Sequence, residues 1–174
     1  MKGASIGLSY HLHSSASRHD SRTEVEFRQV EHTQVPIALL LEDDPLQERV
    51  LSYLPECLCF VAVKDKSVVG ACAVKPLAHQ LGELFNIAVQ PNQQTKGIGT
   101  QSLTFTLAQR KAGGFHRVEL GTGAFGYQLR YYQRLGFRVD SVVKNHFLEH
   151  YSEAIYGDSV QHKDMSRLYL KLAD

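Results

Sequence analysis

The sequence predicts one mixed α/β (α+β) domain, and three observations support this fold class. A strand-like run, Leu81–Val89, is followed by a glycine turn at Gly97–Gly99 and by helical periodicity over Thr100–Lys111. Alternating segments before this stretch predict paired strands, and strands alternate with helices after it. At 174 residues with 43% hydrophobic residues, the chain suits a single domain with a buried core.

The first half of the domain is predicted as a strand, two helices and a hairpin. Glu24–Val30 alternates polar and apolar residues, as a half-buried strand does, and Pro36 opens a short helix through Leu41. Asp44, Pro45 and Gln47 predict the N-cap, first position and capping box of a second helix. The hairpin elements are strands at Cys57–Val63 and Val68–Val74, joined by a turn at Lys64–Ser67.

The second half continues with alternating strands and helices. The expected elements are a strand at His116–Leu120, a turn at Gly121–Ala124, a helix at Tyr127–Leu135, a strand at Phe137–Val143 and a last strand through Leu168, Leu170 and Leu172. No helix or strand is predicted for the long polar and aromatic stretch between residues 144 and 165.

Composition excludes several classes of function. Net charge is +1 and the basic residues are scattered, which argues against nucleic-acid or membrane partners. The three cysteines, Cys57, Cys59 and Cys72, indicate a reducing, cytoplasmic location and are expected to be small buried strand residues rather than metal ligands, so no metal is predicted. Residues 1–23 are too polar for a signal peptide and are expected to form a flexible extension, with the domain spanning 24–174.

The glycine turn predicts an anion site. A helix that begins at Gly97–Gly99 leaves its first backbone N–H groups free, and they carry partial positive charge. A Walker-type phosphate loop is excluded because its string is absent from the sequence. Gly97, Gly99, Ser102 and Glu119 match a dinucleotide-binding motif imperfectly. Several residues separate the glycines from the preceding strand, and the chain after Glu119 is too short to complete a dinucleotide-binding fold.

A family resemblance explains the turn better. Gln94-Thr95-Lys96-Gly97-Ile98-Gly99, after a strand that ends in Val89-Gln90-Pro91, resembles the acetyl-CoA motif of the GNAT superfamily of N-acetyltransferases. The run Tyr131-Tyr132-Gln133-Arg134-Leu135-Gly136-Phe137 is similar to the superfamily's later signature. The resemblance covers all but about the first two dozen residues. It implies a mostly antiparallel central sheet, splayed in the middle and flanked by about four helices.

The resemblance also implies the binding site for acetyl-CoA as co-substrate. The expected contacts are to the pantetheine arm from the strand and to the pyrophosphate from the turn and helix. They are Ile87, Ala88 and Val89 on the strand, and Gln94, Thr95, Lys96, Gly97, Ile98, Gly99 and Thr100 beyond it. A bulge is expected to splay the central strand from the one at Val118–Leu120 and to open the cleft.

Two side chains receive catalytic roles from the resemblance. Tyr132 matches the tyrosine that protonates the departing thiolate, a role that suits a phenol because it is protonated at neutral pH. Glu83 lies where relatives carry the general base, although a solvated glutamate at a strand end is an equal alternative. His146 and His150 are second candidates for the base.

The predicted function is acetyl-CoA-dependent transfer of an acetyl group to a primary amine of a small molecule by direct attack. Acidic residues near the expected acceptor site suggest a cationic amine, and the alternative is that they cap helices or lie in solvent. They are Glu42, Asp43, Asp44, Glu149, Glu153 and Asp158. A protein or peptide N-acetyltransferase and a non-catalytic acyl-CoA sensor stay open, as does a homodimer.

Overall fold

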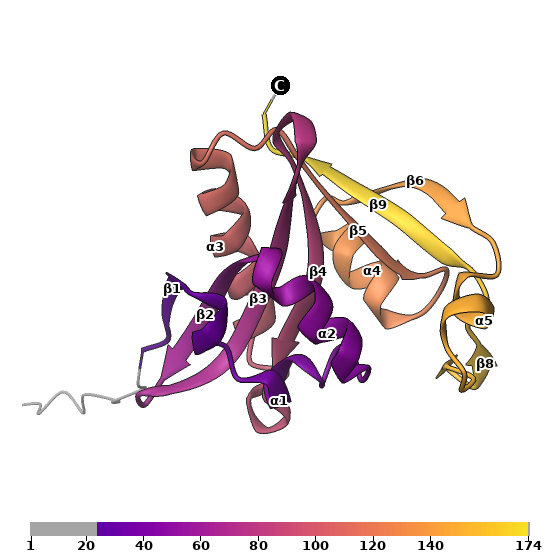
Figure 1. The fold of residues 1–174 in the computed structure, drawn as a ribbon, viewed down its shortest axis with the longest axis horizontal. Helices are drawn as coiled ribbons and strands as arrows, with labels where there is room; N and C mark the ends of the chain where they lie inside the picture. Colours follow the sequence, from indigo (N-terminus) through magenta and orange to yellow (C-terminus); the bar gives the residue numbers. More distant parts are fainter. Residues whose placement is uncertain (1–23, 174) are drawn as a thin grey trace, which may run out of the picture.

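The computed structural model describes residues 24–173, shown as a ribbon in Figure 1. The predicted extension, residues 1–23, lies outside the described residues. The strands are β1 Glu26–Val30, β2 Leu58–Lys64, β3 Ser67–Leu77, β4 Leu81–Val89, β5 Arg117–Gly123, β6 Arg138–Val143, β7 Tyr156–Gly157, β8 Val160–Gln161 and β9 Met165–Lys171. The α-helices are α1 Ile37–Leu40, α2 Gln47–Tyr53, α3 Ile98–Ala112, α4 Tyr127–Arg134 and α5 His146–His150.

The main sheet has seven strands in the order β1-β2-β3-β4-β5-β9-β6. Every neighbouring pair is antiparallel except β4 and β5, which run parallel. This confirms the predicted mixed, mostly antiparallel sheet. Among residues 24–173 there are five α-helices where about four were expected, and the short α5 is the one that the polar sequence after residue 144 concealed.

Alternate residues of β2 and β3 face two helical layers. Cys59 and Val61 pack with α1 and α2, whereas Phe60 and Cys72 pack with α3 and α4. This division follows from the period of two along a strand. The prediction of buried strand residues is confirmed for Cys59 and Cys72, which are about 1% exposed and contribute to the two cores. For Cys57 it is wrong, because this residue is half-buried and precedes β2.

β4 and β5 lie together at one end and diverge toward the other (Figure 1). Their pairing covers only three positions and ends at Glu83 beside Glu119. Just beyond, the register of β3 and β4 passes from Val74–Leu84 to Ala73–Asn86, so Phe85 is a bulged residue. The bulge and the splay expected from the resemblance are therefore present, and the open edge of β4 faces α4.

The predicted N-cap of the second helix is wrong. Asp44 does not cap α2, which begins three residues later and has the extended residue Leu46 at its N-cap. The Asp44 carboxylate instead accepts a hydrogen bond from the Leu46 N–H at 3.2 Å and pairs with Arg49 Nε at 3.3 Å. The local turn and this ion pair together satisfy the carboxylate before the helix starts.

The predicted turn at Gly121–Ala124 is also wrong, because β5 continues through Gly123 and pairs with β9. These glycines serve close packing. A Cβ at Gly121 would collide with the Met165 side chain, and one at Gly123 would collide with the His162 ring. Glycine here allows close approach inside a strand, a role that composition alone does not separate from a turn.

Asn86 ties the sheet to the turn after α1. Its side-chain amide is about 1% exposed and donates to the Leu40 carbonyl at 2.9 Å and to the Tyr53 hydroxyl at 3.0 Å. The Leu40 carbonyl also accepts the backbone N–H groups of Asp43 and Asp44. Asn86 thereby fixes the turn that carries these two acidic residues against β4.

Replacing Asn86 by Ala is expected to lower stability by about 1–3 kcal/mol, because the buried Tyr53 hydroxyl loses its partner. For a chain of this size the melting temperature should fall by roughly 2–4 °C per kcal/mol. Calorimetry measures the change. Ser52→Ala is the control, since that exposed hydroxyl bonds only the Arg49 carbonyl and its loss should change stability by less than about 0.5 kcal/mol. Equal stability of both variants would contradict the anchoring role.

No helix among residues 24–173 is both long enough and apolar enough to cross a membrane.

Candidate active site

A cavity of about 540 Å³ lies between the open edge of β4, the start of α3, helix α4 and the turn after α1. Nine of the ten residues predicted to bind acetyl-CoA line it: Ile87, Ala88, Val89, Gln94, Thr95, Gly97, Ile98, Gly99 and Thr100. The exception is Lys96. Its exposed ammonium is folded back onto the Asn92 carbonyl at 3.0 Å.

The start of α3 is built to receive an anion. Gly97 is the N-cap and has a left-handed backbone conformation, φ 82° and ψ 0°, that a residue with a Cβ rarely adopts. The first hydrogen bond of the helix joins the Gln101 N–H to the Gly97 carbonyl at 3.0 Å. The N–H groups of Ile98, Gly99 and Thr100 therefore lack partners within the helix and face the cavity end that the pyrophosphate would occupy.

The open edge of β4 forms the second wall. The Gln90 N–H bonds the Val69 carbonyl on β3, so by strand alternation the backbone groups of Ile87 and Val89 point away from β3. The Val89 carbonyl accepts a hydrogen bond from Gln94 Nε2 at 3.1 Å, and the Ile87 N–H lies 3.4 Å from Asp43 Oδ2. An edge without a strand partner is a template for the amide groups of an extended arm such as pantetheine.

Three tyrosines of α4, Tyr127, Tyr131 and Tyr132, line the same cavity. Tyr132 is 7% exposed. Its burial, and to a smaller extent the nearby Asp43 carboxylate, raise the pKa of its hydroxyl well above the ordinary value. The Tyr131 hydroxyl is buried without a hydrogen-bond partner among the described residues. Because the pKa of Tyr132 is raised, its hydroxyl stays protonated at any working pH. A thiolate in this cavity would also gain proton affinity from burial, as the Cys72 thiol does with a pKa of about 12.

Glu83 lies elsewhere. It does not line the cavity, and its carboxylate accepts a hydrogen bond from Arg167 Nη1 at 2.7 Å. Arg167 also reaches Glu119 Oε2 at 3.4 Å, so one guanidinium neutralises the two carboxylates that the parallel register places side by side. In this arrangement Glu83 holds β4 to β5 where the splay begins.

Comparison with known protein families matches residues 24–137 to the acetyltransferase (GNAT) family. The chain belongs to the GNAT family. It is 36% identical over 135 residues, 77% of this chain and 87% of the other, to the uncharacterized N-acetyltransferase YvbK of Bacillus subtilis strain 168. It is accordingly a GNAT N-acetyltransferase, an enzyme class that uses acetyl-CoA.

Two solved structures extend this result. A GNAT acetyltransferase from Elizabethkingia anophelis with acetyl-CoA bound has a TM-score of 0.79 and 30% identity, covering 84% of this chain and 97% of that one. A protein described as IAA acetyltransferase from Bacillus cereus ATCC 14579 has a TM-score of 0.80 and 32% identity, covering 85% of this chain and 99% of that one. The relative from Elizabethkingia anophelis thus binds acetyl-CoA on the same fold as this GNAT protein.

Two acidic residues that the sequence did not place in catalysis, Glu42 and Asp43, line the GNAT cavity. Asp43 lies on the turn after α1, and burial raises the pKa of its carboxyl to about 6. The acidic run Glu42-Asp43-Asp44 marked this region only as a charge cluster. The three acidic side chains differ in exposure: Glu42 is exposed, Asp43 is half-buried and Asp44 is buried.

A second, mostly polar cavity of about 50 Å³ adjoins the first. Both are lined by Asp43, Ile87, Gln128 and Tyr132, which mark their junction. Gln128 itself is oriented by a 3.3 Å hydrogen bond with the Thr122 hydroxyl. The site therefore has a large compartment and a small polar one beside Asp43 and Tyr132.

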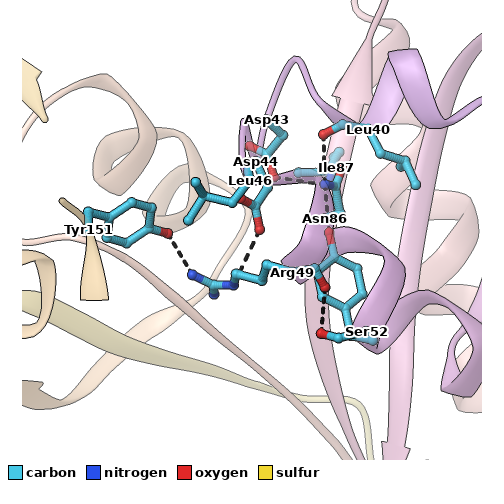
Figure 2. Close-up of polar contacts among 10 residues, drawn as sticks. Leu40, Asp43, Asp44, Leu46, Arg49, Ser52, Asn86, Ile87 and Tyr151 are labelled. Carbon is cyan, nitrogen blue, oxygen red and sulfur yellow. Dashed lines mark hydrogen bonds and ion pairs between the residues drawn. The ribbon is translucent and has the colours of Figure 1, made fainter. Parts of the chain in front are cut away.

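Arg49 joins α2 to the segment after α5 on this side of the site. Figure 2 shows its guanidinium between the Asp44 carboxylate and Tyr151, whose hydroxyl lies 2.6 Å from Nη1. The predicted second candidates for the base lie outside both cavities: the His146 and His150 rings stack on each other at 4.4 Å. The acidic residues Glu149, Glu153 and Asp158 are exposed and also lie outside both cavities.

Proposed function

We propose that this enzyme transfers the acetyl group of acetyl-CoA to a primary amine of a small molecule by direct attack, with Tyr132 as the general acid. One observation carries the proposal. The free helix N-terminus, the open β4 edge and Tyr132 line a single cavity, which combines an anion site, an edge for an extended arm and a proton donor. When bound, acetyl-CoA would supply the acetyl carbon for attack and a thiolate as leaving group.

The small acceptor is supported by the size of the second compartment. A volume of about 50 Å³ has room for an amine head group. Glu42 and Asp43 contribute negative charge to the first cavity, which favours a cationic amine. A cytoplasmic location stays part of the proposal, because Cys57, Cys59 and Cys72 are free thiols.

Two carboxylates, Glu83 and Asp43, are candidates for the general base. The family resemblance makes Glu83 a candidate through its place early in β4. The structure places Glu83 in an ion pair and Asp43 in the cavity.

Acetyl-CoA is expected to raise the melting temperature by roughly 5–10 °C when it is present at about 100 times its Kd. This ligand excess adds about 2.7 kcal/mol of stability, and each kcal/mol corresponds to about 2–4 °C at this size. NAD and ATP at equal concentration are the controls, measured by differential scanning fluorimetry. A shift with NAD and none with acetyl-CoA would refute the assignment of the cavity.

The acceptor class is tested by thiol release from acetyl-CoA with a panel of amines. The panel contains spermidine, kanamycin, leucine and a peptide with a free N-terminal alanine. Turnover is expected with spermidine or kanamycin, because their amines are cationic and accessible. Faster turnover of leucine would contradict the cationic acceptor, and faster turnover of the peptide would favour the protein acetyltransferase. Acetyl-CoA binding with no turnover of any amine would favour the acyl-CoA sensor.

A further inference from the structure

The carboxylate of Asp43 is placed where a proton acceptor for the amine is needed. It projects from the turn after α1, and its Oδ2 lies 3.4 Å from the Ile87 N–H on the open edge of β4 (Figure 2). That edge faces the arm of acetyl-CoA in the proposed function. A nitrogen in contact with Asp43 would thus lie next to the edge of β4 that this function assigns to the arm of acetyl-CoA.

The nearby carboxylates of Asp44 and Glu83 are already paired, whereas Glu42 is exposed at the large cavity. Asp44 contacts Arg49 Nε at 3.3 Å and the Leu46 N–H at 3.2 Å. Glu83 contacts Arg167 at 2.7 Å. Among residues 24–173, no lysine or arginine nitrogen lies within ion-pair distance of Asp43. Of Asp43, Asp44 and Glu83, Asp43 is the one with capacity to accept a proton or to bind an incoming ammonium.

The small polar cavity provides the place for that ammonium. Asp43 lines it together with Asn86, whose side-chain Oδ1 is buried and has no hydrogen-bond partner in the described part of the chain. Asn86 directs its amide N–H groups to Leu40 and Tyr53, so the vacant acceptor is left for another donor. An ammonium has three donors and would satisfy both Asp43 and Asn86.

We propose that Asp43 takes the proton from the acceptor ammonium, which is held in the small cavity between Asp43 and Asn86 Oδ1. This inference rests on the proposed function, because it requires an amine substrate. It replaces Glu83 as the base and assigns Glu83 to the β4–β5 ion pair.

The proton and electron balance is complete with the groups named. The ammonium gives one proton to the Asp43 carboxylate, and the nitrogen lone pair forms the C–N bond with the acetyl carbon while the C–S bond breaks. The sulfur takes the proton of the Tyr132 hydroxyl. The nitrogen then returns one proton to the Tyr132 oxygen, and Asp43 releases its proton to solvent. The products are the amide, the free thiol and one proton.

The electrostatic surroundings make Asp43 suited to this step. Burial raises the pKa of its carboxyl to about 6, Asp44 raises it further, and Arg49 and the hydrogen bond from Ile87 oppose the rise. The other titratable groups that sense its charge are Tyr53 on α2, Cys72 on β3, Tyr132 on α4 and Tyr151 after α5. A carboxylate of this pKa is ionised at neutral pH and holds a proton better than an exposed one.

The test compares Asp43→Asn with the wild type in full-length enzyme, using the member of the amine panel that turns over fastest. In the wild type, kcat/KM should rise with pH through about 6, because the free enzyme must have Asp43 ionised. In Asp43→Asn, kcat/KM at neutral pH should fall roughly 100-fold and this limb should disappear. Glu48→Gln, which removes one exposed charge of α2 outside both cavities, should keep both the rate and the limb.

Two measurements without turnover separate catalysis from folding. Asp43 has a raised pKa in the folded protein, so ionising it costs stability as pH rises from about 4 to 6. Asn lacks this cost and can still accept the Ile87 N–H, so the melting temperature of Asp43→Asn at pH 7 should equal or exceed that of the wild type, with the acetyl-CoA shift retained. A carbon NMR titration should show one side-chain carboxyl near pH 6 that is absent from Asp43→Asn.

Each outcome of these measurements either supports or overturns the role of Asp43 as the base. If Asp43→Asn keeps the acid limb, the inference is overturned, and loss of that limb in Glu83→Gln would return the role to Glu83. If the wild type acetylates no amine although acetyl-CoA stabilises it, the proposed function fails and this inference fails with it. The two failures are distinct, because the first requires an active wild-type enzyme.

Discussion

Tyr132→Phe is expected to lower kcat by roughly 100- to 10,000-fold, the range for loss of a positioned general acid. The ring is buried against Phe137, at 5.7 Å between centroids, and the hydroxyl makes no hydrogen bond within the described residues that would hold the fold. Phe therefore preserves the packing and removes only the hydroxyl group that would donate the proton. Steady-state thiol release with the fastest amine measures the change, and the acetyl-CoA-induced thermal shift should persist.

Two other tyrosines serve as comparisons for this variant. Tyr156→Phe, in exposed β7 outside both cavities, should leave kcat unaltered. Tyr131→Phe tests the adjacent phenol, whose hydroxyl is buried without a partner in residues 24–173. If Tyr131→Phe rather than Tyr132→Phe abolishes turnover, the acid is one residue earlier. Full activity of Tyr132→Phe would remove the general-acid role.

Gly99→Asp is expected to weaken acetyl-CoA binding by roughly 100- to 1,000-fold and to abolish the thermal shift. The added carboxylate would lie beside the N–H groups proposed to hold the pyrophosphate. Two like charges at 4 Å repel by about 4 kcal/mol near a protein surface. Isothermal titration calorimetry with acetyl-CoA measures the loss of affinity.

The fold should tolerate this substitution. A Cβ at Gly99 would lie 3.5 Å from Val89 Cγ2 and 3.7 Å from the Tyr131 hydroxyl, which are ordinary contacts. An acidic residue in the first turn also stabilises a helix through its dipole. Gln101→Asp places the same charge in that turn but outside the cavity, and it should leave affinity within a fewfold of the wild type. Equal loss in both variants would mean that the start of α3 is not the anion site.

Local patterns in the sequence were sufficient for most elements. The bounds of Leu81–Val89 were predicted without error, because a mostly apolar run of this length before a turn is typical of a strand. The glycine turn and α3 were predicted within two residues at the start of the helix, since the motif combines a left-handed position with helical periodicity. Residues 144–165 were missed, because α5 and the β7–β8 hairpin are too short to show a period.

Contacts between distant residues decided the rest. Asp44 has the local pattern of an N-cap, yet Arg49 and the Leu46 N–H occupy it. Glu83 has the position of a base, yet Arg167, 84 residues later, pairs with it. Asp43 became a candidate base only through burial against Ile87 and Tyr132.

The sequence by itself therefore determined the order of elements, the family and the cofactor turn, because these depend on neighbours along the chain. Which carboxylate is free, which is paired and which is buried depends on groups that only the folded sheet brings together. The tertiary structure alone decided the acid–base geometry for that reason.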